Sequence, residues 1–141
     1  MATVNRFEDL EVWKLSRSIV NDVYKFTGEY GFSKDFELRN QIRRSAISLM
    51  SNIAEGFESG SDRKFANYLK IAKGSSGECR SQLYIAFDQG YLKKTDFVDL
   101  KNNLLIVSRM LSKLESYLLN RDASSVRDIE IKYDIDDSYL G

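Results

Sequence analysis

The sequence predicts an all-α fold built from four helices. Apolar residues recur at helical spacing in four stretches of the 141-residue chain, and glycines separate these stretches. The chain contains no proline, so nothing in it blocks a long helix. Its length fits one domain, and eight Phe and eight Tyr residues can supply a core. We expect residues 1–120 to form a four-helix bundle and residues 121–141 to form an acidic C-terminal tail.

The first two predicted helices each carry one apolar stripe. We expect the first helix to begin near residues 7–9 and to end at Gly28 and Gly31, because glycine favours the end of a helix. Gly56 and Gly60 flank the end of the second helix. The stripes are Val12, Leu15, Ile19, Val23 and Phe26 in the first helix, and Leu38, Ile42, Ala46, Leu49 and Ile53 in the second.

The third and fourth helices follow the same rule. Ser61 starts the third helix and Gly90 closes it. The fourth is expected from Asp96 to Leu119, with Thr95 or Asp96 as its N-cap. The stripe of the third helix is Phe65, Leu69, Ala72, Ser76, Cys79, Leu83 and Phe87. In the fourth helix, apolar residues alternate at spacings of three and four, which is typical of a packed seam: Phe97, Leu100, Leu104, Val107, Leu111, Leu114 and Leu118.

Five further apolar residues of the second and fourth helices lie outside these stripes: Ile47, Met50, Ile106, Met110 and Tyr117. This surplus favours a second burial surface, most simply a contact between subunits. The alternative is a short bundle that exposes a few apolar side chains.

Gly74 and Gly77 fall inside the third helix, where each costs about 1 kcal/mol relative to alanine. The sequence therefore predicts a close approach of another helix at these glycines, and Ser45 and Ser48 of the second helix would suit the same contact. The segment KGSSGE around them lacks the spacing of a phosphate-binding loop.

The residue types present exclude several chemistries. There is no histidine, which removes Ser-His-Asp and Cys-His pairs, histidine-ligated zinc and a histidine base. Glu55 and Glu58 could be neighbours on a helix end, but no partner chemistry accompanies them. We interpret Asn52 and Glu55 as polar groups bonded to a facing helix or loop. No enzymatic activity, metal or cofactor is expected.

The chain also carries signals of its location. The single cysteine, Cys79, cannot form an internal disulfide. No stretch of about 18 apolar residues is present, and the N-terminus lacks the order of a secretory signal. These features predict a cytoplasmic protein without membrane contact.

The net charge of zero hides an asymmetry. Residues 39–80 contain eight basic and four acidic residues, a net charge of +4, whereas residues 121–141 contain three basic and six acidic residues, a net charge of −3. A basic stripe on the third helix could follow a phosphate backbone, or it could be the solvated face of an amphipathic helix. The candidate nucleic-acid-binding residues are Arg39, Arg43, Arg44, Arg63, Lys70, Lys73 and Arg80.

Residues 129–136 alternate between apolar and charged side chains, which is the period of a strand. A single strand finds no sheet in a helical bundle. The tail is therefore either loosely ordered or packed along the bundle or a neighbour.

Two segments together resemble one known family. They are QIRRSAISLMSNIAEG at residues 41–56 and FANYLKIAKGSSGE at residues 65–78. This pair is similar to the signature of the small four-helix-bundle proteins encoded in intervening sequences of bacterial 23S rRNA genes. The resemblance spans roughly Phe7 to Leu118, although the proline that the family often has between helices 1 and 2 is missing. It implies an up-down-up-down, antiparallel, left-handed bundle that assembles as a homopentamer.

A related branch of that family is the accessory protein of diversity-generating retroelements, which binds a reverse transcriptase and nucleic acid through a basic pentamer surface. The zero net charge of this chain departs from that branch. The resemblance implies a non-enzymatic oligomeric scaffold that contacts RNA, DNA or a nucleoprotein partner through its second and third helices. The alternative is a purely protein-binding or structural oligomer.

Overall fold

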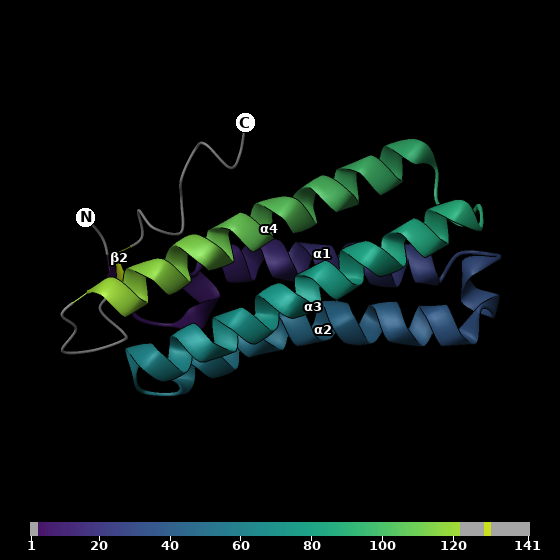
Figure 1. Ribbon diagram of the computed structural model, residues 1–141. Coiled ribbons are helices and arrows are strands. Elements are labelled where there is room, and N and C mark those ends of the chain that lie inside the picture. The colour runs from purple at the N-terminus through teal and green to yellow at the C-terminus, as the bar shows by residue number, and fades with distance from the viewer. Residues whose placement is uncertain (1–2, 122–128, 131–141) are drawn as a thin grey trace.

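The computed structural model describes residues 3–121 and the backbone of residues 129–130. It is an all-α four-helix bundle formed by α1 (Glu11–Thr27), α2 (Phe36–Glu58), α3 (Asp62–Asp88) and α4 (Lys94–Asn120), which confirms the predicted fold class. Each helix packs against two others, so that α1 and α3 both contact α2 and α4. The chain alternates in direction from one helix to the next (Figure 1).

Local sequence signals set most helix boundaries. The short 3-10 helix η1 (Phe7–Asp9) precedes α1, and η2 (Phe32–Lys34) precedes α2. A side-chain oxygen of Asp35 accepts a hydrogen bond from the Leu38 amide at 3.2 Å, and Ser61, as predicted, caps α3 by accepting from the Lys64 amide at 3.2 Å. The predicted cap of α4 is wrong. Thr95 and Asp96 lie inside its first turn, after Lys93, which caps without a side-chain bond.

The predicted stripes form the core. All seven seam residues of α4 are buried, as are the five stripe residues of α2. Most of the surplus apolar residues pack against the core of the same chain, whereas the sequence favoured a second burial surface for them. Met110 is buried, and Met50, Ile106 and Tyr117 are partly buried against the same core, so only Ile47 remains exposed, at 40 %. The bundle therefore absorbs most of the surplus within one chain.

The close helix contact lies at a different glycine from those predicted. A Cβ atom placed on Gly74 or Gly77 would meet nothing within 4 Å inside the chain, so the interpretation of these two residues is wrong. A Cβ atom on Gly56 would lie 2.7 Å from the Cβ atom of Tyr68 and 2.8 Å from Cδ1 of Phe65. Gly56 is thus the residue that lets the end of α2 approach α3.

Small polar residues tie α2 to α3 further along. The buried Ser45 hydroxyl donates to Oε1 of Gln82 at 2.7 Å, and the Ser48 and Ser75 hydroxyls lie 2.8 Å apart. Ser45 and Ser48 thus do contact α3, but through Gln82 and Ser75 and not at the glycine contact for which the sequence suggested them. Cys79 lies next to this layer and is fully buried; burial raises the pKa of its thiol to about 11.

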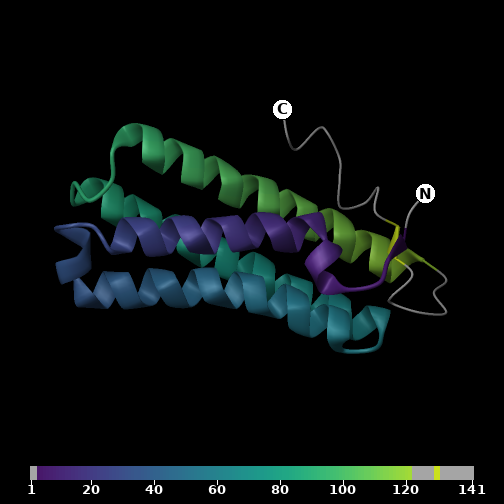
Figure 2. The same cartoon turned by 180° about the vertical axis from the view of Figure 1, so that it is seen from behind.

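The two ends of the described chain meet. Thr3–Val4 (β1) pairs antiparallel with Ile129–Glu130 (β2), beside the C-terminal end of α4 (Figures 1 and 2). The period-2 segment thus finds a partner strand at the N-terminus, which the helical pattern did not predict. Arg121 also holds the end of α4, because its guanidinium donates two hydrogen bonds to the Asp62 carboxylate at 2.8 and 2.9 Å. The remainder of the acidic tail, residues 122–128 and 131–141, lies outside the described residues.

Candidate functional site

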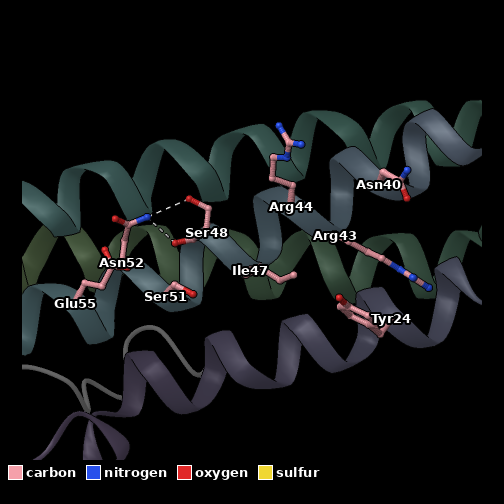
Figure 3. A pocket seen from close by; sticks show the side chains of 9 residues that line it. All are labelled: Tyr24, Asn40, Arg43, Arg44, Ile47, Ser48, Ser51, Asn52 and Glu55. Carbon is pink, nitrogen blue, oxygen red and sulfur yellow. Dashed lines mark hydrogen bonds between the residues drawn. The ribbon is translucent and has the colours of Figure 1, made fainter.

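A shallow groove of about 620 Å³ runs along the outer face of α2 (Figure 3). Residues facing away from the core form it because they recur at three and four positions along the helix, out of phase with the buried stripe. All but one of them come from α2. The lining residues are Tyr24, Asn40, Arg43, Arg44, Ile47, Ser48, Ser51, Asn52 and Glu55.

Two adjacent arginines give the groove its positive charge, and they point to opposite sides of it (Figure 3). Arg43 turns toward α1, where its Nε donates to the Thr27 hydroxyl at 2.8 Å and its guanidinium lies 4.4 Å from the centre of the Tyr24 ring. Thr27 is itself fixed, since its hydroxyl donates to the Val23 carbonyl at 2.6 Å. Arg43 is therefore held in one orientation.

Arg44 has a different environment. It is exposed on the side of α3 and forms no hydrogen bond or ion pair with the described residues. Its five N–H donors are available to an anionic ligand. The groove thus combines one positioned guanidinium with one free guanidinium.

The polar residues of the SNIAEG segment lie at the other end of the groove. Asn52 donates to the Ser48 carbonyl at 2.8 Å and to the Ser48 hydroxyl at 3.0 Å, and that hydroxyl reaches Ser75 on α3. The interpretation of Asn52 as a group bonded within the bundle is confirmed, although its direct partner is on its own helix. Glu55 is exposed and has no hydrogen bond within the described part of the chain, so the same interpretation is wrong for Glu55.

The other predicted basic residues do not line the groove with Arg43 and Arg44. Arg39 is held by the loop before α2: it donates to the Ser33 carbonyl at 3.0 Å and lies over the Phe36 ring. On α3, Lys70 turns toward α4 and lies 3.6 Å from a Glu115 carboxylate oxygen. Lys73 and Arg80 share the helical stripe of Lys70, with Lys73 exposed and Arg80 half-buried, and the exposed Arg63 begins that stripe.

The seven predicted residues therefore form two groups rather than one continuous band. One group lies along α2, and the other lies on the side of α3 next to α4. The outer face of α3 separates them and carries Ile71 and Ile85, which are 53 % and 48 % exposed.

Of the nine groove residues, sequence reasoning assigned only Arg43 and Arg44 to a site. It missed the other seven, which are Tyr24, Asn40, Ile47, Ser48, Ser51, Asn52 and Glu55. The signal that could have found the α2 members was the outward stripe itself, which repeats every three or four residues from Asn40 to Glu55. Tyr24 had no such signal because it comes from another helix.

The described residues show neither a metal-binding cluster nor a membrane-spanning segment. No group of three or more His, Cys, Asp or Glu side chains among them could hold a metal ion. Among the helices described, none has the length and apolar character needed to cross a bilayer.

Comparison with known proteins gives a matching family model and similar solved structures. The family model of the 23S rRNA-intervening sequence protein matches residues 8–113. The crystal structure of a protein of unknown function from the S23 ribosomal protein family of Bacteroides thetaiotaomicron is similar at 27% sequence identity. It has a TM-score of 0.62, and the match covers 72% of this chain and 91% of that chain. No curated protein shows significant sequence similarity to the chain.

Proposed function

The chain belongs to the family of 23S rRNA-intervening sequence proteins, and we propose that it is a non-enzymatic homo-oligomeric scaffold that binds RNA through α2. The RNA is held by its phosphate backbone. The α3 group of basic residues provides a second contact on the same ligand or on a nucleoprotein partner.

The composition of the α2 groove carries this proposal. Its lining contains two arginines and the exposed Ser51 hydroxyl, with one carboxylate at its far end. Arginine and serine side chains supply many of the hydrogen bonds that proteins make to phosphates. Tyr24 adds a partly exposed ring on which a base could stack.

Binding of a labelled structured RNA, followed by fluorescence anisotropy, tests the proposal. We expect sequence-tolerant binding that weakens steeply from about 50 to 200 mM salt, because phosphate contacts release counterions. Arg44→Glu should weaken binding more than Lys93→Glu, an exposed residue of the α3–α4 loop that undergoes the same charge change. Equal effects of the two variants would show that only net charge matters.

A triple variant tests the basic residues of α3, which are Arg63, Lys70, Lys73 and Arg80. Replacing Lys70, Lys73 and Arg80 together by alanine should weaken RNA binding without unfolding the bundle, since none of the three is buried. Absence of any RNA binding at the lowest salt would leave the purely protein-binding scaffold as the better account.

Exposed apolar side chains on α3 support the oligomer. Ile71 and Ile85 lie on one outward stripe with Gly74 between them, and Tyr84 beside them is 47 % exposed. Such a surface is covered most simply by another copy of the chain. Light scattering should give the mass of a closed ring, near five chains by the family resemblance, and a monomer at micromolar concentration would refute it.

A further inference from the structure

Two exposed aromatic rings lie where the α2 groove approaches the connection between α1 and α2. Phe36, the first residue of α2, is 63 % exposed, and Tyr24, near the end of α1, is 45 % exposed. Neither ring belongs to the hydrophobic core cluster of the described residues. Because an aromatic ring gains free energy when it leaves water, two such rings in one neighbourhood indicate a surface that a ligand covers.

Phe36 continues the outward stripe of α2 that forms the groove. The stripe begins with residues at spacings of four, three and four, which share one face of a helix: Phe36, Asn40, Arg43 and Ile47. Tyr24 joins this face from α1, since the Arg43 guanidinium extends beside its ring (Figure 3). Arg43 lies two turns beyond Phe36, about 10 Å along the helix axis. A nucleic-acid strand advances about 3.4 Å per nucleotide, so about three nucleotides cover this distance.

Each ring is paired with a guanidinium that the fold holds in place. The Arg39 guanidinium lies 4.8 Å from the centre of the Phe36 ring, and Arg43 has the same relation to Tyr24 at 4.4 Å. Nη1 of Arg39 donates to the Ser33 carbonyl at 3.0 Å, while Arg43 is held from α1 as described above. Within the described part of the chain, Nη2 of Arg39 and both Nη atoms of Arg43 donate no hydrogen bond. A fixed cation with free donors thus stands beside each ring.

The acidic residues nearby leave this surface with a positive net charge. Residues 24–44 contain five basic and three acidic residues, a net charge of +2. The carboxylate of Asp35 is occupied, because it accepts hydrogen bonds from a backbone amide and from the Tyr91 hydroxyl. Glu37 lies about 100° around α2 from the first residue of the stripe, and Glu29 lies in the connection between α1 and η2. The remaining positive charge attracts a phosphate backbone.

We propose that the RNA bound along α2 is single-stranded at this end of the groove, with unpaired bases stacked on Phe36 and Tyr24 and the phosphates between them held by Arg39 and Arg43. This inference rests on the RNA binding proposed above and names the class of RNA. A duplex keeps the faces of its bases inside its own stack, so it cannot offer them to the two rings. Every base has a π face, so the stacking is tolerant of sequence.

Fluorescence anisotropy with a short labelled single strand of RNA, and with the same strand annealed to its complement, tests the proposal. At equal salt the single strand should bind at least about fivefold more tightly, the lower end of what one stacked base contributes, although the duplex carries more charge.

Substitutions at the two rings separate stacking from charge. Phe36→Leu keeps an apolar side chain but removes the ring, so it should weaken single-strand binding about fivefold or more. The dependence of log affinity on log salt should keep its slope, because no phosphate contact is lost. Phe36→Tyr is the matched control and should bind like the wild type. Tyr24→Leu and Tyr24→Phe form a second pair with the same expected contrast.

An introduced tryptophan observes the contact directly. The indole of Phe36→Trp would be exposed, whereas the native Trp13 is only 9 % exposed. A base that stacks on the new indole should quench its fluorescence, so the single strand should quench it and the duplex should not. This readout does not depend on how Phe36→Leu affects the start of α2.

The outcomes distinguish this inference from the RNA-binding scaffold. Equal affinity for single strand and duplex, or an unchanged affinity of Phe36→Leu, would overturn the stacking, while salt-dependent binding that is weakened by Arg44→Glu would keep the scaffold. A smaller assembly of Phe36→Leu in light scattering, with unchanged RNA affinity, would make the ring a contact between subunits and also overturn it. Absence of binding to either RNA would refute the RNA scaffold itself.

Discussion

A methyl group added at Gly56 should destabilise the bundle, whereas the same methyl group at Gly74 should stabilise it. At Gly56 the new carbon would lie 2.7 Å from the Cβ atom of Tyr68, which is fixed to the backbone of α3, and 2.8 Å from the buried ring of Phe65. Neither neighbour can move aside alone, so the ends of α2 and α3 must separate. At Gly74 the carbon would meet nothing within 4 Å.

The expected changes in unfolding free energy follow from two opposing effects of the added methyl group. Overpacking costs about 1–3 kcal/mol, while glycine to alanine in a helix interior gains up to about 1 kcal/mol. Gly56 lies in the last turn of α2, where the gain is smaller, so Gly56→Ala should lose about 1–2 kcal/mol. Gly74→Ala has no opposing contact within the chain and should gain up to about 1 kcal/mol.

Urea denaturation followed by circular dichroism at one fixed protein concentration measures both variants. The midpoint should fall for Gly56→Ala and rise for Gly74→Ala, with unchanged slopes. A neutral Gly56→Ala would show that α2 and α3 are less closely packed there than the structure has them. A destabilising Gly74→Ala would indicate that the subunit contact proposed for the outer face of α3 is closely packed at this glycine.

Four other predictions follow from buried groups. Leu111→Ala should lose about 2–5 kcal/mol of unfolding free energy in urea titrations, because it leaves a cavity in the buried seam of α4. A loss below about 1 kcal/mol would contradict that burial. Cys79 should react with a thiol reagent orders of magnitude more slowly in the native protein than in urea, and rapid native labelling would count against its position. The raised pKa of its thiol, about 11 against an ordinary 9.0, stabilises the fold fully below pH 9, and this contribution is lost as the pH rises toward 11. Unfolding free energies of the wild type and Cys79→Ala should therefore converge over that range, and parallel curves would refute the shift. Arg121→Ala should lose about 1–3 kcal/mol of unfolding free energy, since it removes an ion pair with Asp62 that is held by two hydrogen bonds. The side chains of Arg121 and Asp62 are only 13 % and 14 % exposed. Arg6→Ala, which removes the exposed ion pair with Asp9, is the control and should change the unfolding free energy little.

Periodicity was sufficient to predict the helices and their buried faces because each stripe depends only on residues three and four apart in the sequence. The seam from Phe97 to Leu118 is the clearest case. It was not sufficient for contacts between helices. Gly56 and Gly74 are alike in sequence terms, and only the crossing of α2 with α3 makes one crowded and the other open.

The same limit applies to the candidate site. Charge counting found Arg43 and Arg44, but it could not show that Lys70 turns toward Glu115 on α4 while Arg43 turns toward Thr27 on α1. The side on which a helical residue lies is fixed by the neighbours its helix acquires, which a single sequence does not contain. For the same reason the strand partner of Ile129–Glu130, more than a hundred residues earlier in the chain, was not predicted.

Because Thr3 pairs with Glu130, these two residues could be joined and the helices connected in a different order along the chain. A two-residue turn such as Asn-Gly between Glu130 and Thr3 would convert the two strands into one β-hairpin. New ends could then open at Gly90, an exposed turn glycine with φ of 78° and free space around it. In such a circular permutant α4 would come first and α3 last, with the same residues in contact. If it folds, the bundle is defined by which helical faces meet, and the position of the first residue is a matter of gene arrangement alone.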